Sequence, residues 1–245
     1  QTCSSYSGPS SSSSPALSLF LERTPEENLY QYQTGVRRFK WYNYQSFDLP
    51  FCGNWTVSQG PHGAYTHKDQ WADAWDFVVE ADGKQFRGDG SRLEDYYCYG
   101  KPVMAPGDGW VVYVENSVDD NPVGVSNKVQ NWGNYVIIKH GDDLYSLLAH
   151  LKRDSFLCEV GQHISKGDIV ALCGKTGLSP YPHLHFQFQS APYAGAPTIA
   201  YPLVNYMEVG ADGPRLCSCG MPGEGSSLFN LNGKNARPFG FLFVR

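Results

Sequence analysis

The sequence lacks an excess of positive charge, a long apolar run and any extended central segment with helical periodicity. Its formal net charge is −5 and its pI is near 5.8. It therefore offers no basic surface of the kind that a phosphate backbone requires, and we expect no nucleic acid as a partner. No run approaches the roughly 18 apolar residues of a membrane span, so no span is predicted. The missing helical pattern argues against a helical domain.

Residues typical of strands and turns are abundant instead. The chain has 26 Gly, 16 Pro and 16 Tyr but only 3 Met, which favours short strands joined by tight turns. Apolar or alternating runs bounded by turn residues predict strands at 74–79, 109–114, 134–139, 144–148, 168–172 and 201–209. We expect a mainly β fold, with a hairpin turn at 141–143.

The composition changes along the chain and divides it into four parts. Residues 1–20 are Ser-rich and are predicted to be a flexible tail. Residues 21–48 would form an extended N-terminal arm, rich in aromatic side chains and starting with a short helix at Thr24. We expect the arm to pack on the following domain, although it could instead cover a groove there. Residues 49–206 would form the main domain, and residues 207–245 a small β segment that contains cysteine.

Cysteine is more frequent than in most cytosolic enzymes of this size. The seven cysteines are Cys3, Cys52, Cys98, Cys158, Cys173, Cys217 and Cys219. They favour disulfides and an oxidising, extracytoplasmic location, either secreted or periplasmic. The spacing of Cys217 and Cys219 does not match the usual CxxC metal or redox motif.

The densest concentration of chemically active side chains is the segment SPYPHLHFQF, which contains His183 and His185. In a β-strand, residues two apart share a face, so both imidazoles would project together. Leu184, Phe186 and Phe188 would form the opposite, apolar face. Two histidines on one face suggest a metal site, although a half-buried strand with unrelated histidines would show the same pattern.

Further candidate ligands lie upstream, in the segment GAYTHKDQWADAWDF. Asp76 stands in an apolar strand, where a carboxylate is costly to bury unless it is paired or bound to a cation. His67 precedes it by nine positions, and Asp69 and Asp73 lie in the polar loop between them. His150 ends another predicted strand and could act on a bound water. Taken singly, these residues could be a loop histidine, a turn cap and a strand-end histidine, but together they favour one site.

The remaining histidines of the domain have simpler interpretations. We interpret His62, His140 and His163 as structural or surface groups. His62 also lies close to His67 in sequence.

Five sequence blocks, in order, resemble the lysostaphin-type zinc endopeptidases that cut peptide links in bacterial cell walls. The blocks are QGPHGAYTHKDQWADAWDF, GKPVMAPGDGWVV, GNYVIIKHGDDLYSLLAHL, VGQHISKGDIVALCGKTG and PHLHF. The resemblance covers roughly residues 49–206. It implies a small antiparallel β-sheet or sandwich domain of the duplicated hybrid motif type, with the site in a groove.

The resemblance also implies a cofactor and roles for individual residues. One Zn²⁺ per chain would be held by His67, Asp76 and His185. His150 and His183 would be non-ligand histidines that activate water and stabilise the transition state.

Two features depart from the family pattern. Many members place the first His and Asp four residues apart, whereas nine positions separate His67 from Asp76; a longer-spaced variant suits the AWDF segment better. The family turn with Asn or Ser at its second position is here Gly174-Lys175-Thr176-Gly177, a change that we expect to be harmless.

The implied reaction is metal-assisted hydrolysis of peptide bonds in peptidoglycan cross-links or stem peptides. Two alternatives remain open at this point. The chain could be a catalytically silent scaffold of the same fold that binds cell wall or regulates another hydrolase. It could also be an endopeptidase that acts on Gly-rich proteins, because such a site can cut any accessible peptide of small residues.

Overall fold

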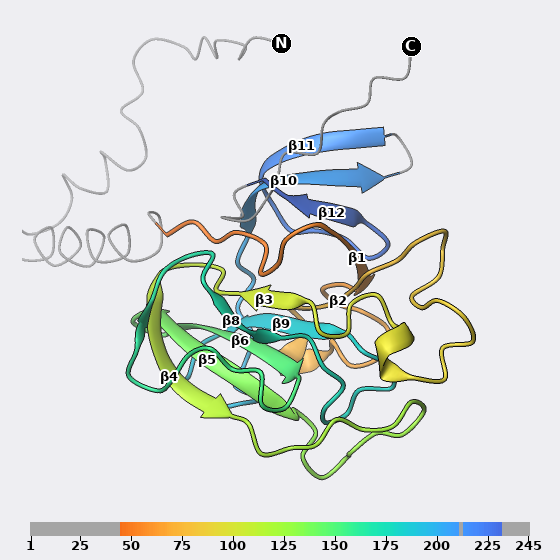
Figure 1. Ribbon diagram of the computed structural model, residues 1–245. Helices are drawn as coiled ribbons and strands as arrows, with labels where there is room; N and C mark the ends of the chain where they lie inside the picture. The colour runs from red at the N-terminus through yellow and green to blue at the C-terminus, as the bar shows by residue number, and fades with distance from the viewer. Residues whose placement is uncertain (1–44, 211–212, 232–245) are drawn as a thin grey trace, which may run out of the picture. The chain divides into compact units, whose positions relative to one another are not determined.

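The computed structural model describes residues 45–210 and 213–231 (Figure 1). The predicted tail, the helix at Thr24 and most of the arm lie outside the described residues. From Ser46 onwards the described chain forms one compact unit. The separation of residues 207–245 from the main domain stays a prediction.

A large antiparallel sheet dominates this unit, which confirms the mainly β fold class. Its ten strands follow the order β11-β10-β12-β1-β2-β9-β6-β5-β4-β7, and β3 and β8 pair separately. The strands are β1 (Asn54–Gln59), β2 (Ala74–Val78), β3 (Pro102–Met104), β4 (Gly109–Glu115), β5 (Asn134–Gly141), β6 (Leu144–Leu151), β7 (His163–Ile164), β8 (Ile169–Leu172), β9 (Leu184–Gln189), β10 (Leu203–Gly210), β11 (Gly213–Gly220) and β12 (Ser227–Asn230). Two short 3₁₀ turns, η1 (Asp69–Trp71) and η2 (Leu93–Asp95), lie in the connections.

Every strand predicted from an apolar run is present, with ends that differ by up to three residues. The hairpin is confirmed, because Gly141 and Leu144 are paired at the turn between β5 and β6. The predicted strand at 168–172 is β8, which lies outside the main sheet and pairs with β3. Five strands were not predicted individually, namely β1, β3, β7, β11 and β12.

The centre of the sheet is buried on both faces. All residues of β2, β6 and β9 are buried. One face of β9 carries Leu184, Phe186 and Phe188, which join the main apolar core as the alternation predicted. Phe47 and Phe51, from the segment before β1, complete this core. The opposite face of β9 is polar but equally shielded from water, and it carries the site described below.

The last described strands extend the same sheet. β12 pairs with both β1 and β10, and β10 pairs with β11. The last described strand therefore pairs with β1, the first described strand. A hydrogen bond from Asn230 Nδ2 to the carbonyl oxygen of Leu49 adds a buried side-chain link. The segment after β9 thereby supports β1 and its neighbour β2, which carries Asp76.

The structure does not show the predicted disulfides. No disulfide joins any two of the described cysteines, which are Cys52, Cys98, Cys158, Cys173, Cys217 and Cys219, and Cys3 lies outside the described residues. Some of these thiols hydrogen-bond to other groups: Cys98 Sγ donates to the carbonyl oxygen of Pro182 at 3.1 Å, and Cys217 Sγ donates to Glu208 at 3.4 Å.

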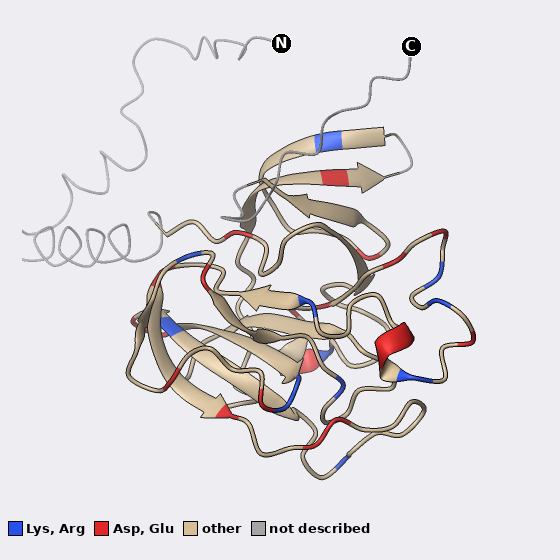
Figure 2. Ribbon diagram, viewed as in Figure 1, with Lys and Arg blue, Asp and Glu red and all other residues tan. Residues whose placement is uncertain are grey.

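Charged residues are scattered along the described chain. Figure 2 shows acidic and basic residues interspersed, most of them in loops rather than in strands. Within the described ranges, no helix is long and apolar enough to cross a membrane.

Candidate metal centre

Strand pairing brings two of the candidate ligands face to face. Asp76 on β2 and His185 on β9 are directly paired in the antiparallel register, and Ala149 on β6 pairs with His185 from the other side. His185 Nδ1 lies 2.9 Å from Asp76 Oδ1. His150 follows Ala149 along β6. The sheet therefore gathers side chains that are more than one hundred positions apart in the sequence.

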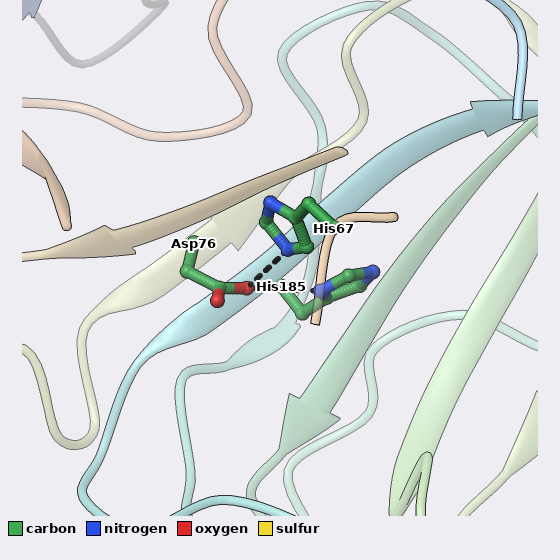
Figure 3. A group of neighbouring side chains, drawn as sticks. All are labelled: His67, Asp76 and His185. Atoms are coloured by element: carbon green, nitrogen blue, oxygen red, sulfur yellow. Dashed lines mark hydrogen bonds and ion pairs between the residues drawn. The ribbon is translucent and has the colours of Figure 1, made fainter. Parts of the chain in front are cut away.

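The third candidate enters from the loop between β1 and β2. His67 is buried, and its Nδ1 lies 2.9 Å from the carbonyl oxygen of Gly60. That bond fixes the ring so that Nε2 points at Asp76 Oδ1, 3.4 Å away (Figure 3). The short 3₁₀ turn η1 takes up part of the loop, so nine positions of chain can separate two side chains that meet.

The donor atoms of these three residues suit a metal ion. His67, Asp76 and His185 each offer one ligand atom, and these atoms all lie within 4.8 Å of one another. His67 Nε2 is fully buried and has no hydrogen-bond partner among the described residues. A buried polar atom without a partner is costly, and a cation bound there would remove that cost. Two imidazole nitrogens and one carboxylate oxygen form a donor set that zinc accepts.

The other ring nitrogen of His185 is also held in place. Its Nε2 lies 3.0 Å from Gln187 Oε1, which can accept a ring N–H, so Nδ1 is the nitrogen that faces Asp76. Gln187 Nε2 in turn donates to Gln189 Oε1 at 2.9 Å. Gln189 Nε2 donates to the carbonyl oxygens of Ala191 and Tyr193. The polar face of β9 is thus a continuous hydrogen-bonded row from the site to the next loop.

His150 and His183 lie beside the three donors with their rings 4.7 Å apart. His150 Nδ1 lies 2.8 Å from the carbonyl oxygen of Thr176, and His183 Nδ1 lies 2.9 Å from that of Tyr181. Both rings must donate at Nδ1, which leaves each Nε2 as an acceptor. His183 Nε2 lies 3.7 Å from Asp76 Oδ1. His150 has a φ of +61°, a strained conformation that recurs at functional sites.

The site separates groups that stay neutral from a group that stays charged. Burial lowers the pKa of His150 well below its usual range, and the neighbouring His183 and His185 lower it further. Burial also lowers the pKa of His183. Burial alone would raise the pKa of Asp76, but the surrounding histidines, His183 foremost, hold it well below its usual range. Burial opposes protonation of His67 as well, yet the nearby carboxylate of Asp76 outweighs burial and raises the pKa of His67.

These groups line a cavity of about 330 Å³. Its lining residues are Ser58, Gln59, Tyr65, Thr66, His67, Trp71, Asp76, Asn131, Trp132, His150, Leu178, Pro180, Tyr181, His183 and His185. Trp71 is anchored by a hydrogen bond of 2.8 Å from its Nε1 to the carbonyl oxygen of Gly195. Trp132 meets Trp71 edge-on at 6.4 Å and His185 at 5.3 Å. Among these described lining residues there is no Lys, Arg or Glu.

The structure brings together all five residues singled out from the sequence. Asp69 and Asp73 lie outside this group, and Asp73 faces the exposed His62 at 3.6 Å. His163 is exposed beside Trp110, and His140 is buried away from the cavity. The placements of these last three histidines agree with a structural or surface interpretation.

Sequence reasoning missed the residues that position the candidates. Gln187 could have been found, because it continues the alternation of His183 and His185 on a fully buried strand. The backbone carbonyls of Gly60 and Thr176 carry no sequence signal. Lys175 is fully buried, and its Nζ donates to the carbonyl oxygens of Pro122 and Val125. It thereby braces the loop that leads to Trp132.

Fold and site together define an antiparallel β protein with a candidate histidine and aspartate metal-binding set in a pocket. A sequence profile of Peptidase family M23 matches residues 94–197, a segment that contains His150, His183 and His185. This match confirms the lysostaphin-type resemblance over that part of the chain. His67 and Asp76 precede the matched segment and are brought to it by the fold.

Individual relatives match over a similar length. Peptidoglycan DD-endopeptidase ShyA of Vibrio cholerae is 36% identical over 88 residues, which cover 36% of this chain and 17% of that protein. Murein hydrolase activator NlpD of Escherichia coli is 34% identical over 90 residues, which cover 37% of this chain and 20% of that protein. The catalytic domain of lysostaphin from Staphylococcus simulans aligns with a TM-score of 0.37 and 20% identity, over 59% of this chain and 86% of that one. The match thus spans a fifth or less of either curated relative.

Proposed function

We propose that this chain is a zinc-dependent endopeptidase that hydrolyses peptide bonds in peptidoglycan cross-links or stem peptides. Its M23 domain and its peptidoglycan-acting relatives support this substrate class, and an extracytoplasmic location follows from it. The observation that carries the proposal is the buried, unpartnered His67 Nε2, which points at Asp76 beside two neutral histidines in an open pocket.

His67, Asp76 and His185 would hold the ion. When bound, zinc would act as a Lewis acid on the scissile carbonyl and on the attacking water. The carbonyl oxygen of Gly60 and the side chain of Gln187 each accept a hydrogen bond from the non-ligating ring nitrogen of one histidine, which orients the other nitrogen towards the ion. Asp76 stays ionised over the whole neutral range, because its pKa is held well below its usual range.

His150 and His183 would move the protons. Each presents a neutral Nε2 towards the site, so either can take a proton from water as its oxygen attacks the carbonyl carbon. The same nitrogen then returns that proton to the leaving amine as the C–N bond breaks. The carbonyl oxygens of Thr176 and Tyr181 hold the Nδ1–H of each ring and stabilise the imidazolium formed between the two steps.

Two other functions each have one supporting observation. The cavity walls are aromatic and contain no Lys, Arg or Glu among the described lining residues, which also suits an uncharged chain of small residues such as a Gly-rich protein. The match to a murein hydrolase activator suits a silent scaffold. The complete set of three donors and two neutral histidines favours an enzyme over the scaffold.

The test removes the donors one at a time. His67→Ala, Asp76→Ala and His185→Ala should each abolish zinc binding, measured by metal analysis, and the release of soluble peptides from purified peptidoglycan. His62→Ala is the matched control, because His62 is exposed in the same loop and should retain both properties. Hydrolysis retained in all three donor variants would refute the proposal.

A parallel digestion identifies the substrate. Purified peptidoglycan and a Gly-rich protein are incubated with the zinc-loaded chain, and the products are identified by mass spectrometry. Peptidoglycan fragments support the proposed substrate. Cleavage of the protein alone would assign the site to Gly-rich chains, and zinc binding without any cleavage would support the scaffold.

A further inference from the structure

One residue hydrogen-bonds to Asp76 and to the backbone immediately before His67, although neither the family resemblance nor the sequence pattern singled it out. Gln59 is the last residue of β1 and is 5% exposed. The register between β1 and β2 shifts between Val57 and Gln59, and this irregularity places Gln59 directly opposite Asp76. Bulges of this kind re-aim side chains near active sites. Gln59, Asp76 and His185 thus form one row across three strands.

All the hydrogen-bonding capacity of the Gln59 carboxamide is used. Nε2 donates to Asp76 Oδ2 and to Thr66 Oγ1, each at 2.9 Å. Oε1 accepts the backbone N–H of Tyr65 at 2.9 Å and that of Thr66 at 3.1 Å. The orientation of the amide is unambiguous, because a carboxylate only accepts and a backbone N–H only donates. Glutamate could not replace Gln59 without losing both donors.

The hydrogen bonds of Gln59 hold both Asp76 and the loop that carries His67. The bond to Asp76 holds Oδ2, the carboxylate oxygen that faces away from the histidines, and leaves Oδ1 to face His67 and His185. The bonds to Tyr65 and Thr66 hold the backbone immediately before His67. A single side chain therefore links two ligands that the sequence separates by nine positions.

We infer that Gln59 is a positioning residue of the metal centre, which restricts Asp76 to one ligating oxygen and fixes the His67 loop next to it. This inference rests on the proposed function only in that the site takes zinc. It explains how the long spacing between His67 and Asp76 still yields a compact donor set.

The close approach of Gly63 to Gln59 offers a second way to displace the Gln59 side chain. Gly63 lies in the loop before His67 without a positive φ, and a Cβ built there would come within 2.4 Å of Gln59 Cγ and 2.9 Å of Oε1. Gly63→Ala should therefore displace the Gln59 amide from Asp76 while leaving the amide chemically intact.

The first experiment measures zinc affinity directly. Gln59→Met keeps the length of the side chain but removes its polar atoms. The metal-free protein, checked for folding by circular dichroism, is titrated with zinc against a chromophoric chelator. We expect about 10- to 100-fold weaker zinc binding, the usual effect of losing an outer hydrogen bond to a metal ligand. Gln162→Met, on an exposed residue before β7, is the matched control and should bind as the unaltered chain does.

The second experiment perturbs Gln59 without replacing it. Gly63→Ala should weaken zinc binding in the same direction as Gln59→Met, and it keeps the inference testable if the methionine variant does not fold. Gly223→Ala is its control, because a Cβ there meets no atom within 4 Å. Unchanged zinc affinity in Gln59→Met, or in Gly63→Ala, would overturn the inference.

Cobalt substitution tests whether Gln59 restricts Asp76 to one ligating oxygen. If Gln59 restricts Asp76 to one oxygen, Gln59→Met should let both oxygens bind, raise the coordination number and weaken the visible d–d absorption of the Co²⁺ protein. An identical Co²⁺ spectrum in the two proteins would contradict this role. Failure of the unaltered chain to bind zinc or cobalt would instead refute the proposed function, so the two failures are distinguishable.

Discussion

His140 and His150 make an instructive pair, because they lie on adjacent strands and are equally buried, each 6% exposed. Both have Nδ1 at 2.8 Å from a backbone carbonyl oxygen, that of Asp108 for His140 and that of Thr176 for His150. They differ at the other nitrogen. His140 Nε2 meets Ser146 Oγ at 2.8 Å, whereas His150 faces the cavity with its Nε2 left as an acceptor.

The comparison shows that burial alone does not distinguish a structural histidine from a functional one. A buried imidazole with both nitrogens hydrogen-bonded has no capacity left for chemistry, and it stabilises the fold. A buried imidazole that keeps one nitrogen for a pocket gives up a stabilising bond and can exchange a proton there. The left-handed backbone of His150 adds strain that fits the second case.

The largest effect is expected when His150, the functional histidine of the pair, is replaced. His150→Ala should lower kcat for peptide hydrolysis by roughly 10²- to 10⁴-fold, because a positioned proton acceptor is lost. Zinc content should stay at the level of the unaltered chain, since His150 is not among the three donors. His163→Ala, on an exposed histidine, is the control. Full activity in His150→Ala would show that the free nitrogen has no catalytic use.

Replacing His140, the structural histidine of the pair, should lower stability and leave catalysis unchanged. His140→Ala should destabilise the fold by about 3 kcal/mol, because it opens a cavity and leaves Ser146 and the carbonyl of Asp108 without their partner. Activity per folded molecule should be unchanged. Urea unfolding combined with an activity assay checks both. A stable but inactive His140→Ala variant would reverse the two assignments.

The pH dependence of stability should report His140 specifically. Burial lowers the pKa of His140 to about 4, from an ordinary value of 6.5. The folded state therefore binds fewer protons than the unfolded state between these values, so this stabilisation is full above pH 6.5 and is lost as the pH falls towards 4. At about 1.4 kcal/mol per pKa unit, the loss is up to about 3 kcal/mol. The free energy of unfolding, measured with urea across this pH range, should vary less with pH in His140→Gln than in the unaltered chain. Parallel profiles for the two proteins would show that His140 is not the source of the pH dependence.

The smallest expected effect concerns the pH dependence of activity. Because the pKa values of His150 and His183 lie below the usual 6.5, both proton acceptors stay neutral at and somewhat below that pH. The acid limb of kcat/KM, which reports groups of the free enzyme, should therefore fall below pH 6.5 rather than at it. An acid limb at or above pH 6.5 would show that neither buried histidine is the proton acceptor.

The strands were predictable where one face had to be apolar. Leu184, Phe186 and Phe188 alternate, and they gave both the existence of β9 and the face on which His185 lies. β1 was missed because its sequence, NWTVSQ, stands at the end of an aromatic-rich segment, and its short alternation is set by pairing with β2 and β12. β12 was missed for a similar reason, since four residues gain strand geometry only from their partners.

The candidate ligands were predictable because they break a local sequence pattern. The supporting residues were not, because they fit one. An aspartate within an apolar strand, as at Asp76, or two histidines on one face of a strand, violates a local pattern and so indicates a site. Gln59 violates no pattern, because a polar residue at a strand end is ordinary. Its role depends on a register shift and on a loop that folds back to it, and both are tertiary features.

The account depends most on three side chains sharing one cation. Anomalous diffraction at the zinc absorption edge, from crystals of the zinc-loaded chain, measures this directly. We predict one peak per chain, within about 2.0–2.2 Å of His67 Nε2, Asp76 Oδ1 and His185 Nδ1. A peak bound elsewhere, or no peak near these atoms at saturating zinc, would contradict the proposed hydrolase.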